Sequence, residues 1–239
     1  YDGDLPAMSG MGSSSSFTVG MLNALYQLKN IGISPHKLAK ESIYIEQTLV
    51  GEKVGSQDQV NAAFGGLNRI EFFRNGDFQV CPVSADQKRV RKLEENLMLF
   101  FSGISRKAEN IASTYLPDIG SRKKQLNRFH MMVDEGLEIL KGSGDLHEFG
   151  LLLHESWMLK RSLSNQVSNL VVDELYDKAR SAGALGGKLT GAGGGGMLLL
   201  YVPKEKQDSV KAELSEFLHI PFCFEGVGSR VIFDGENAR

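Results

Sequence analysis

Apolar residues recur at helical spacing in the first part of the chain. The first stripe consists of Phe17, Met21, Leu25 and Leu28. This i, i+4, i+8, i+11 pattern predicts an amphipathic helix with these residues on one buried face. A second helix is expected from Ser34 to Gly51, because Ser34 can cap it and Pro35 suits its first turn.

The next segments have the alternation and turn residues of strands. Asn68–Phe73 and Phe78–Val83 flank Asn75-Gly76, so we expect a β-hairpin closed by a tight turn. Ser84–Asn96 is charged and poor in apolar residues, which indicates a boundary that carries at most a short helix. Leu97–Phe101 is a short apolar run and is predicted to be a buried strand.

From Ser105 to Gly183 the pattern is helical. Its apolar stripes are Leu126, Phe129, Val133, Leu137 and Leu140; Leu146, Phe149, Leu153 and Trp157; and Val167, Leu170, Val171, Leu175 and Ala179. After it we expect a strand, a helix and two closing strands, at Met197–Val202, Lys204–Leu218, Ile220–Glu225 and Arg230–Phe233. Helices and strands are mixed without a regular βαβ rhythm, which predicts the α+β class.

Composition narrows the function classes. The 239 residues carry a formal net charge of −2, so nucleic acid is not an expected partner. No apolar stretch approaches the roughly 20 residues that span a bilayer, so no membrane partner is expected. Two cysteines, Cys81 and Cys223, are too few for a disulfide scaffold, which suits the cytoplasm. Because the chain opens with Tyr1 and not with methionine, we expect that it begins inside a longer gene product.

A glycine- and serine-rich loop, GMGSSSS at Gly10–Ser16, leads directly into the first predicted helix. Glycines allow close approach of the backbone to a ligand, and the unpaired N–H groups of a helix start favour an anion, most often phosphate. Serine hydroxyls can cap the helix, bond a phosphate oxygen or bind Mg²⁺. Considered alone, the serine run also fits a flexible linker.

A second glycine loop, KLTGAGGGG at Lys188–Gly196, makes the linker interpretation less favourable. It contains a formal G-x-G-x-x-G, but that dinucleotide motif must follow a strand and open a helix. Here the glycines lead into an apolar strand, so the match is spurious. Two glycine loops that can present N–H groups to anions indicate a nucleotide phosphate together with a second substrate, either a sugar or a phosphorylated compound.

The order of four motifs identifies a family resemblance. GMGSSSS, Glu46, SQDQ at Ser56–Gln59 and KLTGAGGGG at Lys188–Gly196 together resemble the superfamily of galactokinase, homoserine kinase, mevalonate kinase and phosphomevalonate kinase (GHMP kinases). The resemblance covers nearly the whole chain. It implies a two-lobed α+β fold with a ribosomal protein S5 domain 2-like N-terminal lobe and a ferredoxin-like C-terminal lobe. We therefore expect an ATP-binding lobe at residues 1–84 and a second lobe at residues 85–239.

The stretches AAFGGLNRIEFF, LFFSGISRKAENI and LHESWMLKRSL are most similar to the bacterial D-glycero-D-manno-heptose 7-phosphate kinases. These enzymes phosphorylate the anomeric hydroxyl to give the 1,7-bisphosphate used in heptose synthesis for surface polysaccharides. The resemblance implies a Mg-ATP-dependent sugar kinase. A fucokinase or galactokinase-type hexose 1-kinase, a catalytically silent regulator on the same fold, and a plain interaction module remain as alternatives.

The resemblance assigns roles residue by residue. Asp58 matches the aspartate that accepts or orients the proton of the sugar hydroxyl. Glu46 and Ser14 match the Mg²⁺ ligands, and one or two carboxylates with phosphates and waters is a usual magnesium arrangement. The residues that match the two ATP-binding loops are Gly10, Gly12, Ser13, Ser14, Ser15, Thr190, Gly191, Gly193 and Gly194. Considered singly, Glu46 also fits an exposed helix carboxylate, and Asp58 a helix cap.

A phosphosugar substrate requires cations for its phosphate. Arg106, Lys160 and Arg161 lie in stretches that resemble the sugar kinases, and Arg and Lys are the usual phosphate-binding side chains. A solvated helix face explains these residues equally well. The family also begins with a strand and a loop that bears a basic residue, and nothing upstream of Tyr1 matches them here.

Overall fold

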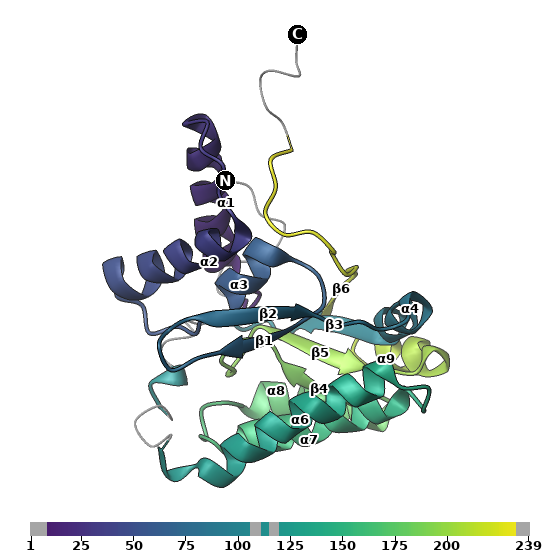
Figure 1. The fold of residues 1–239 in the computed structure, drawn as a ribbon. Helices are drawn as coiled ribbons and strands as arrows, with labels where there is room; N and C mark the ends of the chain where they lie inside the picture. The colour runs from purple at the N-terminus through teal and green to yellow at the C-terminus, as the bar shows by residue number, and fades with distance from the viewer. Residues whose placement is uncertain (1–8, 106–110, 115–119, 233–239) are drawn as a thin grey trace. The chain divides into compact units, whose positions relative to one another are not determined.

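The computed structural model describes residues 9–105, 111–114 and 120–232. Figure 1 shows the mixture of helices and strands that the pattern predicts. In chain order the helices and strands are α1 Ser13–Leu28, α2 Pro35–Tyr44, a π-helix Ile45–Leu49, α3 Gln57–Phe64, β1 Asn68–Phe72, β2 Phe78–Pro82, α4 Gln87–Glu95, β3 Leu97–Phe101, α6 Lys123–Lys141, α7 His147–Arg161, α8 Leu170–Ser181, β4 Gly186–Leu189, β5 Met197–Tyr201, a 3₁₀ turn Lys204–Lys206, α9 Gln207–Glu213 and β6 Leu218–Ile220.

The chain divides into two compact units. Unit 1 contains Gly12–Val83 and the described part of Phe224–Arg239, whereas unit 2 contains Ser84–Cys223 and the described part of Leu5–Met11. The division differs in two short segments from the one at residue 84 expected from the sequence. The local composition of a short segment does not indicate which of two units, distant in the sequence, the segment packs against.

Unit 1 is built from α1, α2, the π-helix, α3 and the β1–β2 hairpin. Ser34 caps α2 by accepting a bond from the Lys37 N–H, and Pro35 occupies the first turn, as predicted. The sheet is antiparallel, with Ile70 opposite Val80, so the predicted hairpin is confirmed. The buried core of this unit comprises Val19, Leu38, Ala39, Val60, Ala63 and Phe78.

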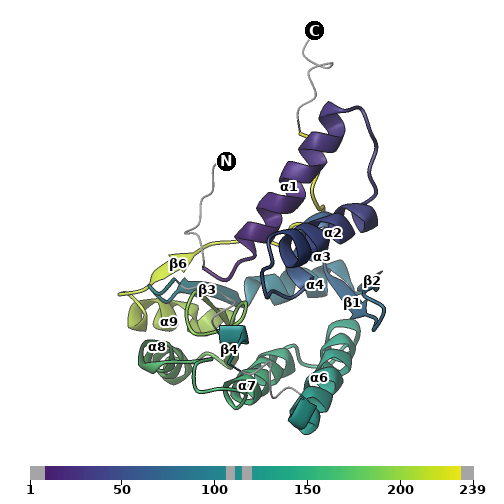
Figure 2. The ribbon, with the colours of Figure 1, turned by 90° about the vertical axis from the view of Figure 1, so that its left-hand side faces the viewer.

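The first helix forms where the apolar spacing predicts it, but the prediction of its buried face is wrong. The stripe residues are exposed, Leu28 to 80%. The buried residues of α1 are instead Ser15, Thr18 and Val19. Small side chains on this face allow close packing against α2 and α3. Figure 2 shows α1 with these two helices beside it.

Unit 2 is organised around a four-stranded antiparallel sheet with the strand order β4-β5-β3-β6. Along the chain these strands follow a β-α-β-β-α-β order, in which α6, α7 and α8 fill the first connection and α9 the second. Figures 1 and 2 agree that α6, α7 and α8 lie on one side of this sheet. Strand β3, predicted from Leu97–Phe101, is confirmed.

The stripe residues Leu126, Val133, Leu170 and Val171 are exposed, so their predicted burial is wrong, whereas other stripe residues lie in the core of unit 2. Trp157 of α7 and Leu175 of α8 are fully buried in it, together with Leu198 and Leu200 of β5. The third stripe is interrupted, because α8 begins at Leu170 and Val167 lies before it. Strand β4, which the glycine content of its sequence concealed, pairs with β5 and places Lys188 opposite Leu199.

The C-terminal elements are shorter than expected. The helix predicted at Lys204–Leu218 is a 3₁₀ turn followed by α9, which ends at Glu213. The strand expected from Ile220 instead ends there as β6. Up to residue 232, where the described chain ends, no strand forms after β6. Edge segments of this kind depend on pairing with other strands, which local patterns do not reveal.

No helix in the described ranges has the length and apolar character that crossing a lipid bilayer requires.

Candidate functional site

The first glycine loop has the backbone geometry of an anion-binding turn. Gly10 and Gly12 have φ values of +79° and +64°, a region that residues with a Cβ rarely adopt. Gly12 is the N-cap of α1, and no side chain from the described part of the chain caps this helix. The first-turn N–H groups, beginning at Ser13, therefore keep the free donors that attract anions to helix starts.

Asp58 lies directly against this loop. It is the second residue of α3, and a Cβ on Gly12 would be 2.9 Å from the Asp58 Cγ atom. Only glycine at position 12 therefore allows the loop and the carboxyl group to approach this closely. The structure thus brings together Gly12 and Asp58, which are 46 residues apart in the sequence.

Glu46 occupies a buried position in the π-helix and is held from two sides. Its Oε2 atom accepts hydrogen bonds from Ser15 Oγ at 2.9 Å and from Gln59 Nε2 at 2.5 Å. The residue is only 3% exposed. π-Helical turns are rare and are often found at functional sites. Because Gln59 comes from α3 and Ser15 from α1, three elements of unit 1 fix this carboxylate.

The second carboxylate oxygen of Glu46 is available to bind a cation. Oε1 is buried and has no partner among the described residues, and the same is true of Gln59 Oε1. A buried carboxylate without a positive partner is costly, so a cation there would be stabilising. In the described ranges no group of three His, Cys, Asp or Glu side chains could hold a metal ion. A site with one protein carboxylate is consistent with Mg²⁺, which keeps several waters and phosphate oxygens.

The three serines assigned to the site, Ser13, Ser14 and Ser15, have different surroundings in the structure. Ser15, and not Ser14, contacts Glu46. Ser14 is exposed, and its carbonyl oxygen accepts a bond from Thr18 Oγ1 at 3.2 Å. Ser13 begins α1. Gln59 was missed by sequence reasoning, since nothing in the pattern distinguishes it from the neighbouring polar residues of SQDQ.

The electrostatics of Asp58 follow from its neighbours. Burial raises the pKa of Asp58. The hydrogen bond that Gln57 Nε2 donates to Asp58 at 3.4 Å opposes this rise, and repulsion by Glu46 makes a smaller contribution that raises the pKa. Two carboxyl groups in mutual electrostatic range, one buried and one beside a glycine loop, are typical of sites that handle protons and cations together.

The second glycine loop connects β4 with β5 in unit 2 and lies against Gly10. A Cβ on Gly10 would be 3.2 Å from the Thr190 carbonyl oxygen, and one on Gly191 would be 3.2 Å from the Gly10 Cα atom. Thr190 Oγ1 donates to the Met197 carbonyl at 3.2 Å. The Met197 N–H donates to the Ser9 carbonyl at 3.0 Å, so residues 9 and 10 are attached to this loop.

Several amides of this loop are used to hold its shape. The N–H groups of Thr190, Gly194 and Gly196 donate to the carbonyls of Met197, Val167 and Ile104. Gly193 has a φ of +112°, and a Cβ there would be 2.7 Å from the Val167 carbonyl oxygen. For the amides of Gly191, Ala192 and Gly193, the described residues provide no acceptor.

The three candidate phosphate-binding cations have different surroundings. Lys160 Nζ donates to the Gly191 carbonyl at 2.5 Å and so lies on the second glycine loop. Arg161 points instead to Asp173, with 2.9 Å between Nη2 and Oδ1. This ion pair neutralises Arg161, which the sequence could not show because Asp173 lies on α8. Arg106 lies outside the described residues.

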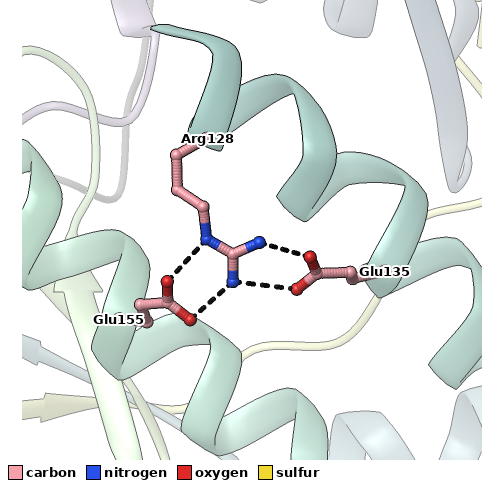
Figure 3. A network of polar contacts seen from close by, with 3 residues as sticks. All are labelled: Arg128, Glu135 and Glu155. Atoms are coloured by element: carbon pink, nitrogen blue, oxygen red, sulfur yellow. Dashed lines mark hydrogen bonds and ion pairs between the residues drawn. The ribbon is translucent and has the colours of Figure 1, made fainter. Parts of the chain in front are cut away.

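Helix α7, which carries Lys160, is attached to α6 by an ion-pair network (Figure 3). Arg128 of α6 donates to both oxygens of Glu155 on α7, at 2.6 and 2.7 Å, and also binds Glu135 of its own helix. These bonds from Arg128 lower the pKa of Glu155. Such forked geometry fixes the two helices more firmly than a single surface ion pair.

Comparisons with known proteins place these features in a family. Residues 1–66 match the GHMP kinases N terminal domain, and residues 137–220 match the GHMP kinases C terminal family. D-glycero-alpha-D-manno-heptose 7-phosphate kinase of Campylobacter jejuni is 32% identical over 95% of this chain and 68% of its own length. The bifunctional fucokinase/GDP-fucose pyrophosphorylase of Arabidopsis thaliana is 29% identical over 89% of this chain and 21% of its own length.

Solved structures give the same result for the fold. The crystal structure of a D-glycero-D-manno-heptose 1-phosphate kinase from Bacteroides thetaiotaomicron superposes with a TM-score of 0.73 at 28% identity, covering 94% of this chain and 64% of that one. The chain thus spans about two thirds of the length of these heptose kinases. On the sequence matches and the shared α+β fold, the chain belongs to the GHMP kinases.

Proposed function

We propose that this protein is a Mg-ATP-dependent sugar kinase that phosphorylates an anomeric hydroxyl, with D-glycero-D-manno-heptose 7-phosphate as its substrate and the 1,7-bisphosphate as its product. Membership of the GHMP kinases and the similarity to heptose kinases support this assignment. The observation that carries it is the cluster in unit 1, where Gly12, Asp58 and the buried Glu46 are held together.

The residues of the cluster have complementary tasks. The sugar hydroxyl donates its hydrogen bond to Asp58, which orients the oxygen toward the γ-phosphorus and takes the proton. The new bond joins that oxygen to phosphorus, the bond to the β-phosphate oxygen breaks, and ADP leaves. Phosphoryl transfer has a loose transition state, so positioning and charge neutralisation provide most of the rate enhancement. Burial of Asp58, which raises its pKa, makes it a better proton acceptor than an exposed aspartate.

Glu46 and Ser14 would hold Mg²⁺, with Ser15 and Gln59 fixing the orientation of Glu46. When bound, Mg²⁺ neutralises charge on the β- and γ-phosphates of ATP. The residues proposed to bind the nucleotide phosphates are Gly10, Gly12, Ser13, Ser14, Ser15, Thr190, Gly191, Gly193 and Gly194. The free donors at the start of α1 support this proposal. The finer fold assignment is an S5-like lobe at 1–84 and a ferredoxin-like lobe at 85–239, and the strand order of unit 2 supports the ferredoxin-like part.

A panel of sugars tests the substrate. ADP release is measured with Mg-ATP and heptose 7-phosphate, unphosphorylated heptose, mannose 6-phosphate, fucose and galactose. We expect kcat/KM for heptose 7-phosphate to exceed that for each free sugar at least about tenfold, since charge-assisted contacts to a phosphate contribute roughly 1.5–3 kcal/mol. Equal turnover of free hexoses would overturn the phosphosugar assignment.

A hexose 1-kinase is the second candidate. Its support is the similarity to the fucokinase of Arabidopsis thaliana and to the galactokinase of Pyrococcus furiosus, which is 29% identical over 90% of this chain. In that case fucose or galactose is the best substrate of the panel. A catalytically silent regulator would release no ADP with any sugar, and the presence of both Asp58 and Glu46 disfavours it.

A further inference from the structure

Two lysines of unit 2 flank the second glycine loop. Lys160, in the last turn of α7, reaches the loop through the bond from its Nζ atom to the Gly191 carbonyl. Lys188 belongs to β4, three residues before Gly191. The sequence singled out Lys160 only as one of three cations, and it assigned no role to Lys188.

Both side chains are directed to the same region. Lys188 lies on the same face of β4 as Gly186, because the side chains of a strand alternate. A Cβ on Gly186 would meet the backbone N of His154 at 2.7 Å, so this face of the strand is covered by α7. Lys188 therefore extends from the sheet toward the helix that carries Lys160. Burial lowers the pKa of Lys160, and repulsion by Lys188 lowers it further, which is consistent with this placement.

The pair has excess positive charge. Among the described residues, neither ammonium group forms an ion pair with a carboxylate, and the neighbouring Arg161 is neutralised by Asp173. Burial, together with Lys188, lowers the pKa of Lys160 to about 7, and burial also lowers the pKa of Lys188. Both lysines are half-buried, and placing cations there without a partner is unfavourable unless an anion compensates them.

Backbone donors complete the surroundings. The amides of Gly191, Ala192 and Gly193 lie next to Lys160 along the loop, and the described residues provide no acceptor for them. Successive free N–H groups in glycine-rich turns form concave anion sites. The loop amides are assigned above to the nucleotide phosphates, and the two ammonium groups beside them are charge-assisted donors of the kind that bind a phosphate monoester.

We propose that Lys160 and Lys188 bind a phosphate monoester beside the Gly191–Gly193 segment. The inference rests on the proposed function for its choice of ligand, which is the terminal phosphate of the phosphosugar. A nucleotide phosphate has the same chemistry, so the experiment has one arm for each source.

Isothermal titration calorimetry on the protein and on the variants Lys160→Met and Lys188→Met tests the site. The probes are heptose 7-phosphate, unphosphorylated heptose and Mg-ATP. We expect each variant to weaken heptose 7-phosphate binding at least about tenfold, because a charge-assisted hydrogen bond is lost, and to leave unphosphorylated heptose unaffected. If Mg-ATP binding is weakened instead, the lysine pair remains a phosphate site but belongs to the nucleotide.

Two further variants exclude loss of folding as the cause. Lys160→Arg keeps the charge and should retain most of the affinity. Lys124→Met removes an exposed lysine of α6 and should change nothing. Inorganic phosphate should raise the melting temperature of the wild type but not that of Lys188→Met. This thermal readout stays informative if the sugar panel refutes the sugar-kinase proposal. Unchanged affinity for both phosphorylated probes, with an unchanged phosphate-induced shift, would overturn the inference.

Discussion

At the scale of single residues, Gly12 connects backbone geometry with the proposed chemistry. Gly12→Ala would place a methyl group 2.9 Å from Asp58 Cγ at a φ of +64°. We expect stability to fall by roughly 1–3 kcal/mol from backbone strain and kcat to fall at least about 100-fold, because Asp58 is displaced. Urea unfolding and steady-state kinetics measure the two effects.

Gly20→Ala is the matched control, because it lies in the same helix with nothing within 4 Å of the added Cβ. It should stabilise the protein by about 1 kcal/mol through helix propensity and leave kcat unchanged. Equal effects of the two substitutions would show that Gly12 has no special role.

The ionised carboxyl group of Asp58 should lower the stability of the folded protein at pH 7. Its folded pKa is raised, so its contribution to stability is fully present below the unfolded pKa of about 3.9 and is lost as the pH rises through the folded value. Asp58→Asn should therefore be inactive and melt at a higher temperature than the wild type at pH 7. This difference should shrink at pH 4.

At pH 7 the carboxyl group of Asp77 should stabilise the folded protein, which is the opposite of the effect expected for Asp58. The pKa of Asp77 is lowered chiefly by the hydrogen bond from the Phe78 N–H and further by Lys40. Asp77→Asn should lower the melting temperature at pH 7. If Asp58→Asn also destabilises the protein at pH 7, the carboxyl group has a structural role, and the functional assignment loses its electrostatic support.

At the scale of elements, Gln59 links α3 to the π-helix by its bond to Glu46. Gln59→Leu keeps the side-chain volume but removes this donor, so Glu46 should lose its orientation. Because support for metal ligands contributes roughly 10–100-fold to metal affinity, the apparent Kd for Mg²⁺ should rise within that range. It can be followed by Mg²⁺-dependent thermal shift as well as by kinetics.

Gln79→Leu, on an exposed position of β2, controls for the loss of an amide in the same unit. It should change neither the Mg²⁺ dependence nor the melting temperature appreciably. If Gln59→Leu gives the same Mg²⁺ response as the wild type, Glu46 is oriented without it.

The same elements show how much the sequence could predict. The hairpin at Asn75-Gly76 and the helix after GMGSSSS formed as expected, because turn residues and apolar spacing act locally. The buried face of α1 was predicted wrongly, since the packing of Ser15 and Thr18 depends on partners distant in the sequence. Gln59 and the pairing of Arg161 with Asp173 were not foreseeable for the same reason.

At the scale of the whole molecule, the order of the motifs along the chain predicted the family, which the predicted secondary structure alone could not do. The family was identified from two glycine loops with Glu46 and Asp58 between them, and the family matches confirm it. The assignment of residues 224–232 to unit 1 had no signal in the local pattern. The order of the motifs does not identify the substrate either, because the family includes kinases of sugars and of mevalonate.

Product analysis tests the central proposal most directly. The protein and its Asp58→Asn variant are incubated with Mg-ATP and heptose 7-phosphate, and the products are followed by phosphorus NMR. We predict a second phosphate on the anomeric carbon, one ADP for each product molecule, and a rate at least about 100-fold lower in the variant, the usual effect of removing a general base. Equal rates for both proteins, or ADP formation without a bisphosphate, would contradict the proposal.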